Sequence, residues 1–264
     1  MARLFVFGLG YTARRIAAAL EVQGWEVVST GREGTLRFDD AGSVRAALAD
    51  AGHVLSSVPP SADGDPVLAA YGGALGGKWL GYLSSTGVYG DTGGAWVDET
   101  APTGTGRRTA RAEADADWLA RGARVLRLPG IYGPGRSAIE RVESGQGQRI
   151  DAVGQVFSRV HVDDIVQGFT RLLSAAEGAY NLADDQPSSQ NAVIEEACRL
   201  LGREPPPLLA LDAAELTLQA RPFYAENRRV ANGKARRLLD WTPRYPTYRE
   251  GLRACLAARP FGTA

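Results

Sequence analysis

The segment RLFVFGLGYTARRIAAAL, residues 3–20, decides the fold. It opens with an apolar run typical of a buried strand, turns at a G-x-G-x-x-A pattern, and continues as a helix with one apolar face. In such a turn the first glycine permits a tight bend, the second lets the backbone approach a pyrophosphate, and the small third residue lets the helix pack closely. The phosphates then meet free N–H groups at the positive end of the helix dipole. The segment therefore predicts a dinucleotide-binding loop at Gly8, Gly10 and Ala13.

Short apolar runs alternate with amphipathic helical patterns through the first two thirds of the chain. The strongest helical stripe runs from Val162 to Leu173, and Asp163 and Asp164 suit its N-terminal turn. Strands that alternate with helices form parallel sheets with right-handed crossovers, so the pattern predicts an α/β, Rossmann-like, doubly wound parallel sheet. We expect strands at residues 4–7, 26–29, 53–57, 79–84 and 124–128.

The pattern changes after Leu182 to helices that are interrupted by prolines, at 205–207 and at Arg221-Pro222. We expect a NAD(P)-binding Rossmann domain over residues 1–182 and a small, mainly helical C-terminal substrate lobe over residues 183–264. Residues 134–158 are expected to contribute to that lobe.

Composition excludes several classes of function. Thirty basic residues balance thirty acidic ones, so no bulk attraction to nucleic acid or to an anionic membrane is expected. No apolar run approaches the roughly 20 residues of a membrane span, and the first residues enter a strand without a signal-peptide pattern. Cys198 and Cys255 lie in apolar helical patterns that suit a reducing compartment. His53 and His161 offer no metal site of ordinary ligand spacing, and His161 is expected to be a packed, hydrogen-bonded residue. We expect a cytoplasmic protein with a small-molecule substrate.

The end of the second predicted strand bears on the choice of dinucleotide. NAD requires a carboxylate there for the ribose 2′-hydroxyl, whereas NADP requires a cation for the 2′-phosphate. The sequence VVSTGREG, residues 27–34, places Thr30 and Arg32 where the carboxylate would stand, with Glu33 one residue later. Arg32 favours NADP(H) over NAD(H). The alternative is a solvated Arg32 with Glu33 on the ribose.

Four stretches further along the chain join the loop in one pattern: LSSTGVYGDTGGAWVDET at 83–100, RLPGIYGPGR at 127–136, RVHVDDIV at 159–166 and AYNLADDQPSS at 179–189. Together they resemble, in order and over nearly the whole chain, the extended short-chain dehydrogenase/reductases of the NAD-dependent epimerase/dehydratase family. The resemblance implies hydride transfer between a nicotinamide and a sugar or alcohol carbon. It also implies cofactor contacts from Gly8, Gly10, Tyr11, Thr12, Ala13, Thr30, Arg32, Ser57 and Ile131.

The family's catalytic pair is missing from the sequence. In the family a tyrosine, its pKa lowered by a lysine, acts as acid or base, and a serine or threonine hydrogen-bonds the reacting oxygen. Ser85, four residues before Tyr89, occupies the serine/threonine position, but no Y-x-x-x-K pattern occurs in the chain. With Glu113 as the family's helix glutamate, the pair falls on Thr105 and Thr109, on a helix expected to begin near Thr105.

If the protein is an enzyme, the proton must come from outside this helix, and the available sources are Tyr89, Tyr132 or an ordered water held by Ser85. A threonine hydroxyl has too high a pKa to replace a tuned tyrosine, and arginines such as Arg107, Arg108 and Arg111 stay protonated. Tyr89 and Tyr132 are therefore the remaining catalytic candidates beside Ser85. The alternative for each tyrosine is a ring packed against the turn after a strand.

Substrate contacts are suggested at a few positions. Thr86 and Gly87 stand where the dehydratase branch has an acidic pair, which counts against sugar dehydration. Thr86 is a candidate substrate contact, and Arg136 and Arg159 are candidates for a phosphate or carboxylate. The segment 221–224 adds a cation and two aromatic rings. Each arginine has a solvated position as its alternative.

Two functions follow from these observations. The first is an NAD(P)-binding oxidoreductase or epimerase that acts on a sugar nucleotide or a small carbonyl or alcohol through a non-standard active site. The second is a protein that binds NADP(H) as a sensor or scaffold without turnover.

Overall fold

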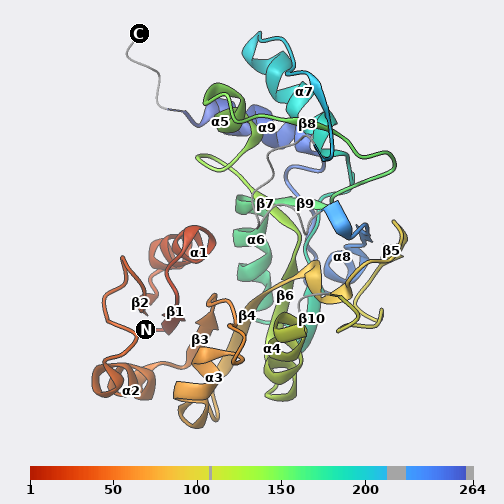
Figure 1. The fold of residues 1–264 in the computed structure, drawn as a ribbon. Helices are drawn as coiled ribbons and strands as arrows, with labels where there is room; N and C mark the ends of the chain where they lie inside the picture. Colours follow the sequence, from red (N-terminus) through yellow and green to blue (C-terminus); the bar gives the residue numbers. More distant parts are fainter. Residues whose placement is uncertain (107–108, 213–223, 260–264) are drawn as a thin grey trace.

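A parallel sheet of six strands forms the centre of the computed structural model, which describes residues 1–106, 109–212 and 224–259. The strand order is β10-β6-β4-β3-β1-β2 (Figure 1). The strands are β1 (Arg3–Phe7), β2 (Glu26–Ser29), β3 (His53–Ser56), β4 (Trp79–Ser85), β6 (Arg124–Leu128) and β10 (Gly178–Asn181). The predicted α/β Rossmann-like sheet is confirmed, with the five expected strands placed to within one residue at each end.

The strands form because both faces of the sheet are covered. Leu4, Phe5, Val6 and Phe7 are all fully buried, which explains why β1 is a continuous apolar run instead of an alternating one. β10 was not among the predicted strands. It has four residues and begins at Gly178, which has a positive φ of 129°, so local propensity indicates a turn there.

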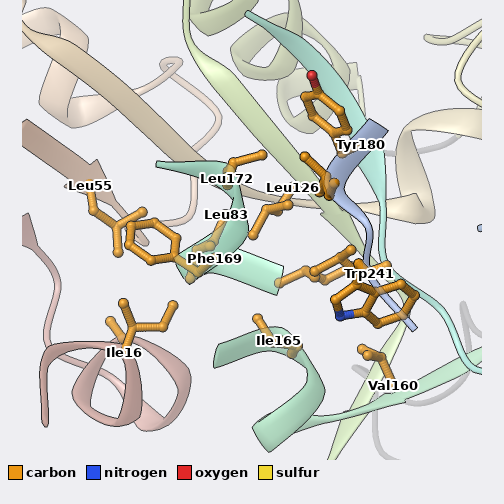
Figure 2. Packing of buried hydrophobic residues seen from close by; sticks show 14 of the residues in the cluster. Ile16, Leu55, Leu83, Leu126, Val160, Ile165, Phe169, Leu172, Tyr180 and Trp241 are labelled. Carbon is orange, nitrogen blue, oxygen red and sulfur yellow. The ribbon is translucent and has the colours of Figure 1, made fainter. Parts of the chain in front are cut away.

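Helices α1 (Tyr11–Val22) and α6 (Val162–Leu172) cover one face of the sheet. Figure 2 shows Ile16 of α1 and Phe169 of α6 turned toward Leu55 of β3. Helices α2 (Ala41–Asp50), α3 (Pro66–Tyr71) and α4 (Thr109–Ala120) cover the other face. There the ring of Trp118 stacks on Tyr82 with 5.4 Å between ring centroids.

A second cluster of helices lies beyond the carboxyl edge of the sheet (Figure 1). Helices α5 (Ala138–Glu143), α7 (Gln190–Leu201) and α9 (Tyr248–Ala257) share one apolar core. β8 (Arg149–Asp151) pairs with β11 (Leu208–Ala210) beside α7. Helix α8 (Gly233–Leu239), however, packs on α6 and β10. Trp241 is buried in the sheet core, and its indole N–H donates to the carbonyl of Asp164. The lobe predicted over 183–264 thus shares residues with the sheet core.

Two short parallel pairs complete the fold. β7 (Gly130–Tyr132) pairs with β9 (Arg159–His161), and β5 (Trp96–Val97) pairs with β12 (Arg229–Val230). Two 3-10 turns, η1 (Gly72–Ala74) and η2 (Thr86–Tyr89), precede and follow β4. Among the described residues, no helix is both long enough and apolar enough to cross a membrane.

Candidate functional site

The strand order reverses between β1 and β3, and ligands of open parallel sheets bind at the carboxyl ends of strands at such a point. Phe7, the last residue of β1, is in register with Ser56, the last residue of β3. Gly8 and Ser57 follow these strands, and the Ser57 hydroxyl donates a hydrogen bond to the Gly8 carbonyl. The structure therefore brings these two predicted cofactor residues together at the switch point.

Gly8 occupies a conformation and a space that require glycine. Its φ is +83°, and a Cβ atom there would lie 3.0 Å from Val58 Cγ2 and 3.1 Å from Ser57 Oγ. The bend turns the chain from β1 directly toward α1.

Gly10 faces open space at the start of α1. It is the N-cap residue, makes no side-chain cap, and a Cβ built there meets no atom within 4 Å. The first bond into the helix runs from Arg14 N to Gly10 O, and within the described part of the chain the N–H groups of Tyr11, Thr12 and Ala13 have no acceptor. This arrangement fits an anionic pyrophosphate, which would approach the backbone at Gly10 and meet those N–H groups.

Thr30 holds the loop from the neighbouring strand end. Its carbonyl accepts the N–H of Gly8 at 3.2 Å and of Leu9 at 2.9 Å, and its hydroxyl also accepts the Gly8 N–H. Because Thr30 is 1% exposed, its side chain shapes the loop and does not face a ligand.

The residues after Thr30 lie against the same loop. Gly31 has a φ of +134°, and a Cβ atom there would lie 3.0 Å from Leu9 N. Arg32 is exposed and forms no ion pair with any described residue. Glu33 forms an ion pair with Arg14 of α1, with 2.7 Å between Nη1 and Oε2.

The GPGR turn, residues 133–136, docks on the first turn of α1. The Tyr11 hydroxyl and Arg15 Nη2 each donate to the Pro134 carbonyl at 3.1 Å. The guanidinium groups of Arg15 and Arg136 lie 4.9 Å and 5.6 Å from the centroid of the Tyr11 ring. Arg136 is exposed, so a candidate anion contact lies beside the phosphate loop.

The remaining predicted cofactor residues lie deeper. Thr12 and Ala13 lie in the first turn of α1 and are buried, and the small side chain of Ala13 lets the helix approach the sheet. Ile131 of β7 is in register with Val160 of β9, and its side chain packs against the sheet core.

Ser85 lies at the carboxyl end of β4 and is half-buried. Its Oγ accepts the N–H of Gly87 at 3.1 Å, which leaves its O–H available to donate. The neighbouring candidate Thr86 is 4% exposed, so the structure offers little of its side chain to a substrate.

Tyr89 belongs to a buried network, which argues against the proton-transfer role expected for it. Its hydroxyl donates to Asn181 Oδ1 at 2.8 Å and accepts from Arg127 Nη1 at 3.0 Å. Arg127 also forms a buried ion pair with Asp115 at 2.7 Å, and Ser84 donates to the same carboxylate at 2.6 Å. Burial raises the pKa of Tyr89, with the charge of Arg127 opposing the change. The residue ties η2 to β6 and β10.

The network also corrects the expected placement of the missing pair. Helix α4 begins at Thr109, so Thr105 is not on it. The buried carboxylate of α4 is Asp115, whereas Glu113 is exposed to solvent. The same spacing, counted from Asp115, places the pair at residues 107 and 111. Arg111 Nη1 donates a hydrogen bond to Tyr82 Oη at 3.3 Å. Residue 107 lies outside the described residues, as do residue 108 and residues 221–223.

Tyr132 is also unsuited to proton transfer. It is 8% exposed, and a Cβ on Gly251 of α9 would overlap its hydroxyl. That hydroxyl has no hydrogen-bond partner among the described residues, and burial followed by the charge of Asp184 raises its pKa.

Arg159 was expected to contact substrate, but its guanidinium group is occupied by the protein. It donates to the carbonyls of Phe157 and Ser188, at 2.8 and 2.9 Å, and to Gln190 Oε1 at 3.2 Å. Burial lowers the pKa of Arg159 to about 10. The side chain joins β9 to the start of α7 and adds donors to two carbonyls that already pair with each other's backbone N–H groups.

Sequence reasoning missed Asp184, just beyond β10. It is 2% exposed, and its Oδ2 has no partner among the described residues. Burial raises the pKa of Asp184 to about 8, and the charge of Arg159 opposes this rise. The AYNLADD stretch places the residue after a strand, but nothing in it indicates burial.

His161 caps helix α6, as expected of a packed residue. Its Nδ1 accepts the N–H of Asp163 at 3.2 Å, and its side chain is fully buried. Burial lowers its pKa to about 4, so it is neutral near pH 7. Across the described ranges no group of histidines, cysteines and carboxylates could hold a metal ion.

The strand order and the glycine turn into α1 give the chain the fold of the short-chain dehydrogenases/reductases. The chain is similar to Protein YeeZ of Escherichia coli K12, with 30% identity over 244 residues that cover 78% of this chain and 86% of YeeZ. It is also similar to a conserved protein of unknown function from Silicibacter pomeroyi, with 40% identity, a TM-score of 0.85, and coverage of 97% of this chain and 99% of that one. No family model matches the chain.

Two further similar proteins have a known cofactor or a named activity. The human epimerase family protein SDR39U1, with NADPH, has a TM-score of 0.77 at 16% identity and covers 97% of this chain and 100% of its own. A Streptomyces 3-diazoavenalumate denitrifying reductase is 32% identical over 137 residues, which cover 48% of this chain and 45% of the reductase. The chain belongs to the same family as YeeZ, and it has the extended short-chain dehydrogenase/reductase fold that solved NAD-dependent epimerases and dehydratases share.

Replacement of Gly10 by valine should abolish dinucleotide binding, because the new side chain enters the space in front of the α1 N–H groups. Gly52→Val is a matched control, since Gly52 also faces open space but precedes β3 at the opposite edge of the sheet. Titration with NADPH should show loss only for Gly10→Val. Unchanged affinity in that variant, with the fold intact by circular dichroism, would show that the phosphates bind elsewhere.

Tyr89→Phe and Tyr132→Phe should have opposite consequences for the free energy of unfolding. Loss of the Tyr89 hydroxyl leaves Arg127 and Asn181 short of a partner, at a cost of about 1–3 kcal/mol. Loss of the Tyr132 hydroxyl removes an unpaired buried group, so that variant should be as stable as the wild type or more stable. Urea denaturation measures both, and a larger loss for Tyr132→Phe would overturn the roles assigned to these residues.

Asp184→Asn should flatten the dependence of stability on pH. A carboxyl with a pKa of about 8 when folded and about 4 when unfolded binds more protons in the folded state between those values. Its contribution to stability is therefore full below about pH 4 and is lost as the pH rises through 8. Unfolding at pH 5 and pH 8 should show that the wild type loses more stability than Asp184→Asn. Parallel pH curves for the two would contradict burial of the ionised group.

Proposed function

We propose that the chain is an NADP(H)-dependent reductase that acts on a small carbonyl compound or a sugar nucleotide and takes the accompanying proton from solvent. One observation carries the proposal: an open phosphate loop at Gly10 shares the carboxyl edge of the sheet with Ser85, while the hydroxyls of Tyr89 and Tyr132 are buried away from it.

The residues at the loop fit a nicotinamide dinucleotide. The α1 N–H groups and the space at Gly10 would hold the pyrophosphate, and Arg32 would face a 2′-phosphate. When bound, the cofactor supplies the hydride. The NADPH described for SDR39U1 supports this choice of cofactor, and the reductase activity named for the Streptomyces relative supports the type of reaction.

The protein's own groups would orient and polarise the substrate. The Ser85 O–H is free to donate to a substrate oxygen, and this donation favours the developing negative charge without releasing the serine proton. Arg136, beside Tyr11, offers a charge for a phosphate or carboxylate of the substrate.

Reduction is favoured over epimerisation because neither of the two candidate tyrosines is suited to act as a base. Oxidation of a sugar hydroxyl, with which an epimerase cycle begins, requires a group that removes the hydroxyl proton. Tyr89 and Tyr132 have raised pKa values, and the arginines stay protonated. A reduced product, by contrast, can take its proton from water.

The same burial supports a second candidate function. With both tyrosines committed to packing, a protein that binds NADP(H) as a sensor or scaffold would have the site described, with Ser85 as part of the turn into η2.

A substrate panel separates the two functions. Purified protein with NADPH and a panel of aldehydes, ketones and sugar nucleotides should show sustained loss of absorbance from the reduced nicotinamide, slowed by Ser85→Ala about 10²-fold, in line with the loss of one oxyanion donor. Gly10→Val is the control for turnover at the loop. Tight NADPH binding with no turnover across the panel would overturn the reductase and leave the sensor.

Arg32→Ala should weaken NADPH binding much more than NADH binding. A charge-assisted contact to the 2′-phosphate contributes roughly 1.5–3 kcal/mol, and NADH lacks that group. Fluorescence titration of both nucleotides measures the difference. Equal losses would move the assignment to NAD(H).

A further inference from the structure

The ion pair between Arg14 and Glu33 stands beside the ribose end of the proposed cofactor site. It joins the first turn of α1 to the loop after β2, with 2.7 Å between Nη1 and Oε2. That loop is pressed against the phosphate loop, since Gly31 leaves no room for a Cβ beside Leu9 N. The side chains of Arg14 and Glu33 therefore meet, next in the chain to the exposed Arg32, where a bound adenosine ribose would project its 2′ substituent.

The pair determines what each nucleotide would meet there. A carboxylate at the end of the second strand accepts hydrogen bonds from the ribose hydroxyls of NAD, and Glu33 is the only such group in the segment 30–34. Its carboxylate is occupied by Arg14. A 2′-phosphate would be attracted by the guanidinium groups of Arg14 and Arg32 and repelled by Glu33.

We propose that Arg14 is a second determinant of cofactor choice: it withholds Glu33 from the ribose hydroxyls and, together with Arg32, attracts the 2′-phosphate. This inference rests on the proposed NADP(H) function. It adds a residue on α1 that acts against NADH by occupying the carboxylate NADH would need.

Stability does not account for the pair. Its side chains are 53% and 57% exposed, and ion pairs so exposed add little to folding. Removal of Arg14 should therefore leave the fold intact, so binding changes can be measured without interference from unfolding. Arg37, further along the same loop and paired with Asp39 at 2.8 Å, is a control for the loss of a loop arginine that forms an exposed ion pair.

Binding titrations test the proposal with four ligands: NADPH, NADH and the fragments 2′,5′-ADP and 5′-AMP. The variants are Arg14→Gln, Arg32→Gln, Glu33→Gln, the double variant Arg14→Gln/Arg32→Gln, and Arg37→Gln. Arg14→Gln should weaken NADPH and 2′,5′-ADP about tenfold, as for loss of one charge-assisted contact, while NADH and 5′-AMP bind as before or more tightly. Glu33→Gln should tighten NADPH, because a repulsive charge is removed. The double variant should prefer NADH, and Arg37→Gln should bind like the wild type.

The outcomes separate this inference from the function on which it rests. If Arg32→Gln is selective for NADPH but Arg14→Gln weakens both nucleotides equally or neither, the role of Arg14 is wrong and the NADP(H) assignment stands. If Glu33→Gln weakens NADPH, Glu33 is not a competitor and the proposal is overturned. If wild type binds NADH as tightly as NADPH and Arg32→Gln is silent, the cofactor assignment itself fails.

Discussion

One backbone carbonyl organises the nucleotide end of this molecule. Thr30 O accepts the N–H groups of both Gly8 and Leu9, so the end of β2 holds the turn after β1 in its tight conformation. Because those two donors are satisfied within the protein, the N–H groups of the first turn of α1 are left to face outward at Gly10. The same contact brings Arg32 and Glu33 beside the loop. Cofactor binding and cofactor choice thus depend on a single junction between two strand ends.

A second junction, below the carboxyl edge of the sheet, holds the Tyr89 hydroxyl inside the protein. The Arg127–Asp115 pair joins β6 to α4, and Ser84 and Tyr89 complete it from β4 and η2. Removal of one partner from a buried ion pair leaves an uncompensated charge and strongly destabilises the folded state, so the stability of the fold depends on this network. Tyr89 is therefore unavailable as an acid. The edge retains the Ser85 hydroxyl, which can polarise an oxygen, and the reductase that we propose would draw its proton from water.

Much of this architecture could be predicted from periodicity, and the failures have physical causes. The five long strands and α6 carry continuous apolar runs or stripes that burial alone dictates. The short pairs β7–β9, β8–β11 and β5–β12 have three residues or fewer in each strand, so their existence depends on partner strands and not on local sequence. β10 is as long as β2 and β3, but it begins at a glycine with a positive φ. Thr30 and Arg159 have side chains that suit ligand binding, but each binds a backbone group more than 20 residues away in the sequence, the Gly8 N–H and the Ser188 carbonyl. For α4 a signal was present: Ala112, Asp115 and Trp118 recur at helical spacing, which marks Asp115, and not Glu113, as the buried carboxylate.

The account is tested most directly by the backbone amide signals of residues 8–13 during titration with NADPH. If the pyrophosphate binds the open N–H groups of α1, the amide resonances of Tyr11, Thr12 and Ala13 should shift at the concentration at which NADPH binds. Their hydrogen exchange should slow at the same concentration, while the amides of Gly8 and Leu9, already bonded to Thr30, should keep their protection. Saturable NADPH binding that leaves Tyr11–Ala13 unchanged and perturbs amides elsewhere would contradict the nucleotide site described above.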